Sequence, residues 1–204
     1  SVQDFPGRIG FWNQGFPPSG PMDSWSFRLA NLLVGNQPGA AGLEAQFIGP
    51  TLKFHDDTVF AICGADMGPK LDGEPVPMWE SVAAKAGQTL EMKFCTLGAR
   101  AYLAFAGGIA SEPWLGSQST FHAAGVGGID GHALQDGQKV ELGDGRGTPG
   151  RKVKAAARPA FATDKRWEIE VVEGPNDDWI DTAGKERFLT TDWKLSGKSA
   201  RSGY

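Results

Sequence analysis

Glycine and proline are spread along the whole of this chain rather than gathered in one segment. Its 204 residues include 29 glycines and 13 prolines, about a fifth of the sequence, well above average usage. Because these residues mark turns, their spread predicts many turns that join short strands and argues against a flexible linker. A chain of this length can bury a sizeable core, as one domain or as one domain and part of another.

One helix is predicted near the start of the chain, between residues 23 and 34. Apolar side chains recur there at helical spacing on one face, and they are Trp25, Leu29, Leu32 and Leu33. Asp23 or Ser24 is a favourable N-cap, and Gly35 is typical of a helix end. The Pro-rich segment 17–21 before this helix predicts a stiff loop, because proline restricts its own backbone and that of the preceding residue.

The remainder of the chain is dominated by strand patterns. Apolar, β-branched or alternating runs predict strands over residues 58–64, 89–94, 101–106, 140–142 and 167–172. Asp72-Gly73 predicts a tight turn, and residues 183–189 a short helix. Residues 143–150 consist almost entirely of turn-forming residues, and a basic, alanine-rich stretch follows. We therefore expect a complete, mainly β domain over residues 1–160 and the beginning of a second unit over residues 161–204.

Charge and composition exclude several classes of protein. The formal net charge is −4 and no Lys/Arg-rich run occurs, so nucleic acid is not an expected partner. No apolar run is long enough to predict a membrane-spanning helix. Cys63 and Cys95 lie in apolar runs, which predicts two buried free thiols and a reducing, cytoplasmic environment. His55, His122 and His132 lack metal-ligand spacing, so no metal site is expected, and no P-loop, GxSxG or HExxH motif is present.

Two local features suggest a binding site, and each also has a purely structural interpretation. The loop from Pro17 to Asp23 leads into a helix N-terminus, where backbone N–H groups bind carboxylates or carbonyl oxygens. The alternative is a stiff turn followed by an N-cap. Asp66 follows a buried strand, and carboxylates at strand ends often face clefts; the alternative is a solvated turn residue. From the residues alone, the chain is a β-rich domain with one conspicuous loop-to-helix junction.

Several segments, read together, resemble one known family. They are SVQDFPGR (1–8), PPSGPMD (17–23), SFRLAN (26–31), VGN (34–36), GLE (42–44), GPTL (49–52), RAYLA (100–104) and LGS (115–117). These segments resemble the carboxyltransferase part of urea carboxylase and urea amidolyase. The family also includes a subunit of bacterial 5-oxoprolinase and the sporulation-kinase-inhibitor antagonist KipA. The similarity extends in one order over nearly the whole chain, and residues 75–79 are most similar to the urea carboxylase branch.

The resemblance implies a tandem of two cyclophilin-like β barrels with the active site between them. This chain would carry the first barrel, with one N-terminal helix, and the start of the second, which in the family continues beyond Tyr204; the chain alone is therefore expected to be inactive. The resemblance also implies a biotin-dependent ligase, in which carboxybiotin on a carrier domain delivers CO2 to urea and allophanate is formed. ATP would be used by a separate biotin carboxylase domain. The implied partners are the biotin carboxylase and biotin carrier domains, urea or a related amide, and the second barrel.

The resemblance also directs attention to particular residues. Asp23 and Asp66 are the expected catalytic residues, because their carboxylates can accept N–H bonds from urea. The expected substrate-binding residues are Gly20, Pro21, Met22, Arg28, Asn31 and Tyr102. Within this set, the N–H groups of Met22 and Asp23 are expected to bind the biotin ureido oxygen or the urea carbonyl, and Tyr102 to donate a bond within the pocket.

Other features of the resemblance leave alternatives open. Arg28 and Asn31 either contact a carboxylate or support the Pro-rich loop. Gln118 and His132 stand where the family usually has arginine, and Ala110 where aspartate is common. Losing two guanidinium groups removes bidentate contacts for a carboxylate, which leaves the substrate open. The alternative functions are a 5-oxoprolinase component, which opens a lactam with ATP and without biotin, and a non-catalytic, KipA-like regulatory protein.

Overall fold

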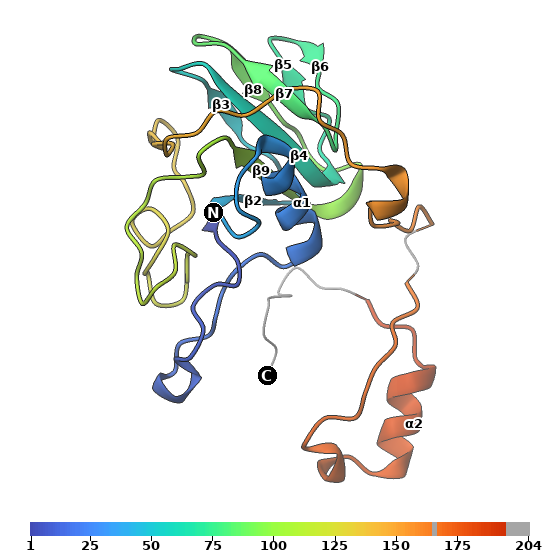
Figure 1. Cartoon of the computed structure of the whole chain (residues 1–204). Coiled ribbons are helices and arrows are strands. Elements are labelled where there is room, and N and C mark those ends of the chain that lie inside the picture. The colour runs from blue at the N-terminus through green and yellow to red at the C-terminus, as the bar shows by residue number, and fades with distance from the viewer. Residues whose placement is uncertain (165–166, 195–204) are drawn as a thin grey trace. The chain divides into compact units, whose positions relative to one another are not determined.

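The computed structural model describes residues 1–164 and 167–194, and the chain divides into two compact units. The first unit comprises Ser1–Phe161 and contains all of the described strands, while the second begins at Ala162 and contains α2 (Thr182–Thr190) (Figure 1). This division lies next to the boundary expected after residue 160. That the units are two carboxyltransferase subdomains stays a prediction.

Two antiparallel sheets form the first unit. The larger has the strand order β1-β2-β9-β4-β7, and the smaller has the order β3-β8-β5-β6. The strands of the larger sheet are β1 (Val2–Gln3), β2 (Gly42–Gln46), β4 (Thr58–Asp66), β7 (Ser81–Ala84) and β9 (Leu97–Phe105). Those of the smaller sheet are β3 (Thr51–Lys53), β5 (Lys70–Leu71), β6 (Glu74–Pro75) and β8 (Thr89–Glu91). The predicted mainly β class is confirmed, whereas the closed cyclophilin-like barrel stays a prediction.

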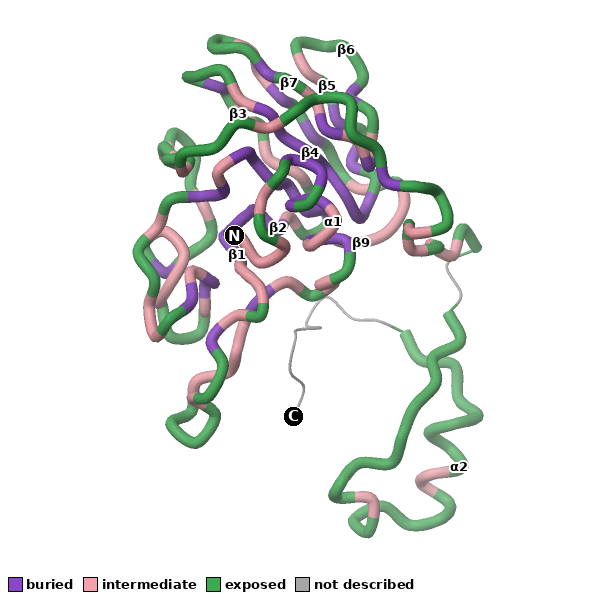
Figure 2. Tube along the Cα trace, viewed as in Figure 1, coloured by how far each residue is buried: buried purple, intermediate pink, exposed green. Residues whose placement is uncertain are grey.

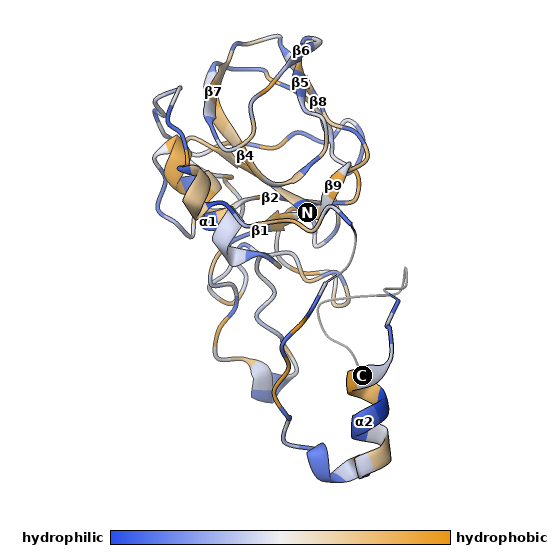
Figure 3. Ribbon diagram, turned by 90° about the vertical axis from the view of Figure 1, so that its right-hand side faces the viewer, coloured by the Kyte–Doolittle hydropathy of each residue, from blue (hydrophilic) through white to orange (hydrophobic). Residues whose placement is uncertain are grey.

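β4 and β9 form the centre of the larger sheet, because most of their residues are apolar and both faces of the sheet are covered. Successive side chains of a strand point to opposite faces. Phe60 and Ile62 of β4 therefore enter the core shared with the smaller sheet, where they join Leu90 of β8. Ala61 and Cys63 face the other way and pack in the cluster that contains the apolar residues of the helix. Figure 2 shows the buried positions gathered on these strands, and Figure 3 shows the hydrophobic colour of β4.

α1 (Ser24–Val34) packs on the outer face of the larger sheet, and its bounds agree with the prediction. Asp23 is the N-cap, and its side chain accepts a hydrogen bond from Ser26 N. Gly35 ends the helix with a φ of 86°, a left-handed conformation that glycine adopts without a steric penalty. The local signals for the start and end of this helix were therefore sufficient.

The buried face of α1 differs from the predicted one. Its buried residues are Ser26, Phe27, Ala30, Asn31, Leu33 and Val34. Trp25 and Leu32, which we placed on the apolar face, are 51% and 44% exposed. The rotation of a helix follows its fit against the sheet. Here Ser26 and Ala30 are small residues turned toward the sheet, while the Trp25 indole N–H donates to Ala157 O on the surface.

The shorter predicted elements have mixed outcomes. Asp72 and Gly73 have φ values of 50° and 88° and join β5 to β6, so the tight turn is confirmed. The strand expected at 140–142 is reduced to one bridge between Ile109 and Leu142, and β8 ends at Glu91 instead of 94. Residues 167–172 form no strand, since they pair with no described residue and an unpaired strand is unstable. The irregular parts include the 3-10 turns η1 (Trp12–Gln14), η2 (Ala155–Ala157) and η3 (Asp177–Trp179).

The second unit has no buried residue among those the structure describes, and Figure 2 shows it mostly in the colour of exposed residues. α2 is the helix expected near residues 183–189, and Asp181 caps it. Lys185 of α2 lies 3.0 Å from Glu173 and 3.2 Å from Asp177. Large exposed apolar side chains of this unit are Trp167, Ile169, Val172, Trp179, Leu189 and Trp193. Neither α1 nor α2 is both long and apolar enough to cross a membrane, and the other described helices are shorter.

The two cysteines differ in accessibility, contrary to the expectation that both are buried. Cys63 is buried, and its burial raises the pKa of the thiol far above the usual range, whereas Cys95 is partly exposed. The thiolate is the reactive form. We therefore expect a disulfide reagent near neutral pH to label Cys95 in the native protein and Cys63 only after unfolding. Mass spectrometry of the labelled peptides measures this, and equally fast labelling of both would contradict it.

Candidate functional site

The Pro-rich loop over residues 17–23 is held by the N-terminal segment of the chain. Arg8 N donates to Pro18 O over 2.7 Å, and a Cβ atom at Gly7 would lie 2.4 Å from the same oxygen. Gly20 is buried and has a φ of 82°, a conformation that favours glycine. These close backbone contacts restrict the conformation of the loop where it leads into α1.

A row of three side chains crosses the larger sheet beneath the N-terminus of α1. Glu44 of β2 is opposite Tyr102 of β9, and Tyr102 is opposite Cys63 of β4. Residues directly opposed in a sheet share a face, so all three side chains lie on the α1 face. Tyr102 is fully buried and Glu44 is 6% exposed. The register of the sheet therefore places a carboxylate and a phenol under the loop.

Glu44 and Tyr102 are the hydrogen-bond acceptors for the loop backbone. Met22 N donates to Glu44 Oε2 over 2.8 Å, and Asp23 N donates to Tyr102 OH over 2.7 Å. We expected these N–H groups to be open to a ligand, but in the structure both have acceptors within the chain. Tyr102 accordingly accepts a bond from the loop. The ligand-binding roles of Gly20, Pro21, Met22 and Tyr102 stay predictions.

The environment of Tyr102 keeps its phenol protonated. Burial raises the pKa of Tyr102 above its usual range, and the neighbouring Glu44 carboxylate raises it further. A neutral hydroxyl both accepts and donates hydrogen bonds. The Tyr102 hydroxyl can therefore accept a hydrogen bond from Asp23 N and donate its own proton to another acceptor at the same time.

Arg100 extends this row along β9. It precedes Tyr102 by two residues and so lies on the same face. Its Nε lies 3.7 Å from Glu44 Oε1, and the side chains are 18% and 4% exposed, respectively. Sequence reasoning did not assign a site role to Glu44 or Arg100. The available signal was a charged residue inside the otherwise uncharged run 42–46, which is unusual for a buried strand.

The Asp23 carboxylate caps α1. It accepts hydrogen bonds from Ser26 N at 3.0 Å and from the Ser26 hydroxyl. Asp23→Ala is expected to lower the free energy of unfolding by about 1 kcal/mol, because the first helical turn loses an acceptor. Asp23→Asn should retain most of the stability, since its amide oxygen still caps. Chemical denaturation measures both, and equal losses would contradict the capping role.

Asp66 lies apart from this row, at the exposed end of β4. Its carboxylate accepts from Gly68 N at 2.9 Å, and its carbonyl accepts from Thr96 N at 2.8 Å. A bulge between Gly64 and Asp66 shifts the register there. Asp66 and Asp23 share no hydrogen bond in the described part of the chain, and the catalytic role of each stays a prediction.

Arg28 and Asn31 lie on adjacent turns of α1 and have different surroundings. The Arg28 guanidinium lies over the Phe5 ring, 5.2 Å from its centroid. Asn31 is buried, donates to Ala40 O at 2.9 Å and accepts from the Asn36 amide at 2.9 Å. Asn31 therefore supports the loop that follows α1, not the Pro-rich loop that precedes it. A substrate contact by either residue stays a prediction.

A second buried polar cluster ties the N-terminal segment to a later loop. The Asp4 carboxylate accepts from the hydroxyls of Ser117 and Ser119, each at 2.5 Å. Arg8 is fully buried; its Nη2 donates to Ser119 O at 2.9 Å, and its guanidinium lies 4.7 Å from the Trp114 ring centroid. This cluster fixes the segment that in turn holds the Pro-rich loop.

The three residues expected to depart from the family pattern, Gln118, His132 and Ala110, are not members of the row beneath α1. The Gln118 amide donates to Ile109 O at 2.9 Å and to Ser111 O at 2.8 Å, so it stabilises the loop in which it lies. Ala110 and His132 are exposed. The Gln118 amide therefore stabilises its loop, and this structural role does not require an arginine at the position.

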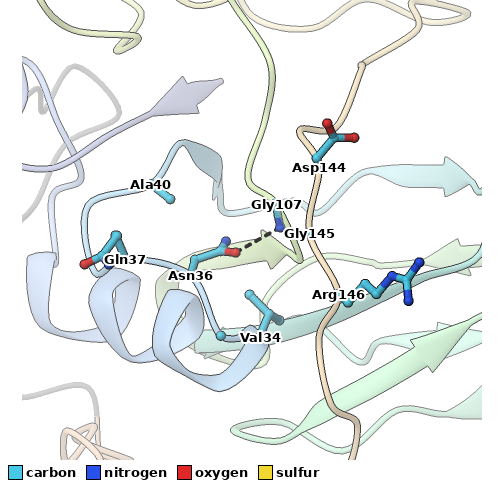
Figure 4. Close-up of a pocket in the computed structure, with 9 residues that line it drawn as sticks. Val34, Asn36, Gln37, Ala40, Gly107, Asp144, Gly145 and Arg146 are labelled. Atoms are coloured by element: carbon cyan, nitrogen blue, oxygen red, sulfur yellow. Dashed lines mark hydrogen bonds between the residues drawn. The ribbon is translucent and has the colours of Figure 1, made fainter.

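A shallow pocket of about 330 Å³ lies at the other end of α1 (Figure 4). It is lined by Val34, Gly35, Asn36, Gln37, Ala40, Gly107, Asp144, Gly145 and Arg146. The Asn36 amide accepts from Gly107 N at 2.9 Å and donates to Phe105 O at 2.8 Å, which satisfies the most buried polar group there. None of the expected site residues lines this pocket. Within residues 1–164 and 167–194, no group of three or more His, Cys, Asp or Glu residues is arranged to hold a metal ion.

The first unit is a mainly β domain of two antiparallel sheets, with α1 packed on the larger one. Glu44 and Tyr102, beneath the N-terminus of α1, fix the junction between the Pro-rich loop and the helix. Residues 14–204 match the sequence model described as carboxyltransferase domain, subdomain A and B. The chain therefore belongs to the carboxyltransferase domain family, and the resemblance inferred from its motifs is confirmed.

Three similar proteins define its relatives. The chain is 39% identical over 210 residues to urea amidolyase of Saccharomyces cerevisiae, covering 100% of the chain and 11% of that protein. It is 36% identical over 204 residues to a 5-oxoprolinase subunit of Escherichia coli, covering 100% of the chain and 64% of that protein. The crystal structure of urea amidolyase from K. lactis matches 98% of this chain and 13% of that one, with a TM-score of 0.92 and 37% identity. The chain thus spans only part of the length of each relative.

Proposed function

We propose that this chain is part of the carboxyltransferase of a biotin-dependent urea carboxylase, which transfers a carboxyl group to urea and forms allophanate. The observation that carries this proposal is the similarity of the whole chain, in sequence and in fold, to proteins named urea amidolyase. The proposed partners are the biotin carboxylase and biotin carrier domains and the second barrel of the family. ATP is used by the biotin carboxylase domain and not by this chain.

The chemistry of carboxyl transfer suits the residues beneath α1. Carboxybiotin supplies the carboxyl group when its carrier domain is bound. The protein has to hold the reactants close together, away from water, and to stabilise negative charge on an oxygen. The loop over residues 17–23 is held rigidly at one side of the proposed site, because Glu44 and Tyr102 accept hydrogen bonds from its backbone N–H groups. The buried Nε of Arg100 has no hydrogen-bond acceptor. This supports a role for the Arg100 cation, which lies near Glu44, in binding an oxyanion.

The test is a product assay on the full-length protein with its biotin carboxylase and carrier domains. Radiolabelled bicarbonate, ATP and urea should give labelled allophanate, and avidin should abolish the product because it sequesters biotin. Guanidine and 5-oxoproline are assayed in parallel. Absence of urea-dependent, avidin-sensitive labelling would overturn the proposal.

The second candidate is a component of a 5-oxoprolinase. It is favoured by 36% identity to a 5-oxoprolinase subunit of which the chain covers 64%, compared with 11% of urea amidolyase. In this case, ATP-dependent opening of 5-oxoproline would proceed in the presence of avidin. A stable complex with a small partner protein, without turnover of any of the three substrates, would favour the KipA-like regulatory alternative.

Asp66→Ala is expected to lower allophanate formation by about 100-fold or more, because the variant loses the carboxylate proposed to accept N–H bonds from urea during the reaction. Because Asp66 is exposed and its carboxylate bonds only to Gly68 N among the described residues, folding should be little changed. Asp56→Ala, at another exposed aspartate, is the matched control. Turnover of the Asp66 variant equal to that of the control would remove the catalytic role.

A further inference from the structure

Among the described residues, three arginines of the first unit have a buried donor nitrogen without a hydrogen-bond acceptor, and they are Arg8 at Nη1, Arg28 at Nε and Arg100 at Nε. Arg8 donates to two backbone carbonyl oxygens through its other nitrogens, and the Arg28 guanidinium lies over an aromatic ring. Arg100 has no hydrogen-bond acceptor at Nε. Its terminal amino groups also lack one within the part of the chain that the structure describes. An arginine carries several N–H donors in a planar fork, so this side chain has unused binding capacity.

The guanidinium of Arg100 is nevertheless oriented. Its Nε lies 3.7 Å from Glu44 Oε1, close enough for strong attraction and too far for a hydrogen bond. Glu44 is itself fixed, because its other oxygen accepts from Met22 N. Glu44 therefore positions the cation without consuming its donors. The Arg100 side chain is 18% exposed, so the fork reaches the surface from a partly buried position.

Arg100 lies at the end of the larger sheet where other features of the proposed site occur. Asp66 is opposite Leu97 at the same end of β9. Phe161, the last residue of the first unit, packs at Gly98, where an added Cβ would lie 3.2 Å from its ring. The start of β9 thus carries the Arg100 cation, and it pairs with the end of β4 that carries Asp66.

We propose that Arg100 is a substrate-binding residue that binds the transferred carboxylate through its terminal amino groups, with Glu44 as its positioning residue. A planar guanidinium matches a planar carboxylate through two parallel N–H···O bonds. This assignment rests on the proposed function, since carboxyl transfer supplies a carboxylate at this site. The ligand class, a small planar carboxylate, follows from the geometry of the guanidinium.

The test is a titration of the 204-residue chain with formate, followed by NMR of the backbone amides of residues 22–25 and of the arginine Nε–H groups. Sodium chloride at matched ionic strength is the reference. A saturable shift is expected in the wild type. Arg100→Gln should weaken formate binding at least about 10-fold, and Arg100→Lys by less, because lysine keeps the charge and loses the fork. Arg146→Gln, at an exposed arginine, should bind formate as the wild type does.

One further variant and one further assay complete the test. Because Arg100→Gln removes one charge of the Arg100–Glu44 pair, the double variant Glu44→Gln/Arg100→Gln removes both, and it should fold and still lose formate binding. Saturable binding that is the same in Arg100→Gln and the wild type, or no saturable binding in the wild type, would overturn the assignment. In the full-length enzyme, Arg100→Lys should lower kcat/KM for carboxyl transfer about 10-fold. If the wild-type enzyme carboxylates no amide, the proposed function fails, while the formate titration still decides whether Arg100 binds carboxylates.

Discussion

Replacing Glu44 by alanine is expected to lower the free energy of unfolding of the first unit by about 3 kcal/mol. The substitution removes the acceptor of Met22 N and leaves the Arg100 guanidinium without its counter-charge. Both groups lie in a region where the carboxylate is 4% exposed, so water replaces the lost interactions poorly. Urea denaturation followed by far-UV circular dichroism measures the change.

Glu44→Gln separates the two contributions. Glutamine keeps an amide oxygen for Met22 N but has no charge to offer Arg100, so a smaller loss of about 1 kcal/mol is expected. Amide hydrogen exchange at residues 22 and 23 should accelerate in the alanine variant and stay slow in the glutamine variant. If the two variants lose the same stability, the hydrogen bond to the loop contributes nothing measurable.

Replacing Phe27 by alanine is expected to cost about 3–5 kcal/mol, the range for deleting a buried phenylalanine. Phe27 is 1% exposed on the sheet-facing side of α1, and its ring lies edge-on to Tyr102 with centroids 5.9 Å apart. The cavity would therefore form between α1 and β9, directly under the helix that follows the Pro-rich loop. Thermal unfolding and urea denaturation both report this loss.

Leu32→Ala is the matched control on the same helix. Leu32 is 44% exposed, so the expected change is within about 0.5 kcal/mol. The pair of substitutions tests which face of α1 is buried, because the hydrophobic pattern alone assigned Leu32 to the core. A large loss at Leu32 together with a small loss at Phe27 would show that the helix is rotated from the position described.

Features that depend on neighbouring residues were predictable from the sequence. The start and end of α1 follow from Asp23 and Gly35, which satisfy the helix ends locally. The turn at Asp72-Gly73 follows from the ease with which both residues adopt positive φ. The central strand β9 follows from an apolar run that suits burial on both faces.

Features of the site that depend on distant residues were not predictable in this way. The acceptor of Met22 N is 22 residues away in the chain, and the acceptor of Asp23 N is 79 residues away. No pattern of neighbouring residues predicts which strands lie beneath the loop. The sequence therefore did not reveal that both N–H groups have acceptors within the chain, although the loop and the cap were recognised, and their ligand-binding role stays a prediction.

By itself, the sequence determined the mainly β class, the one early helix with its cap and stop, and membership of the carboxyltransferase domain family. The tertiary structure decided which face of α1 is buried, that Asn31 supports the following loop, and that Glu44 lies between the Pro-rich loop and Arg100. The physical reason is that turns and helix ends are set by backbone preferences of adjacent residues. Helix rotation and strand register are instead set by packing and hydrogen bonding between residues far apart in the chain.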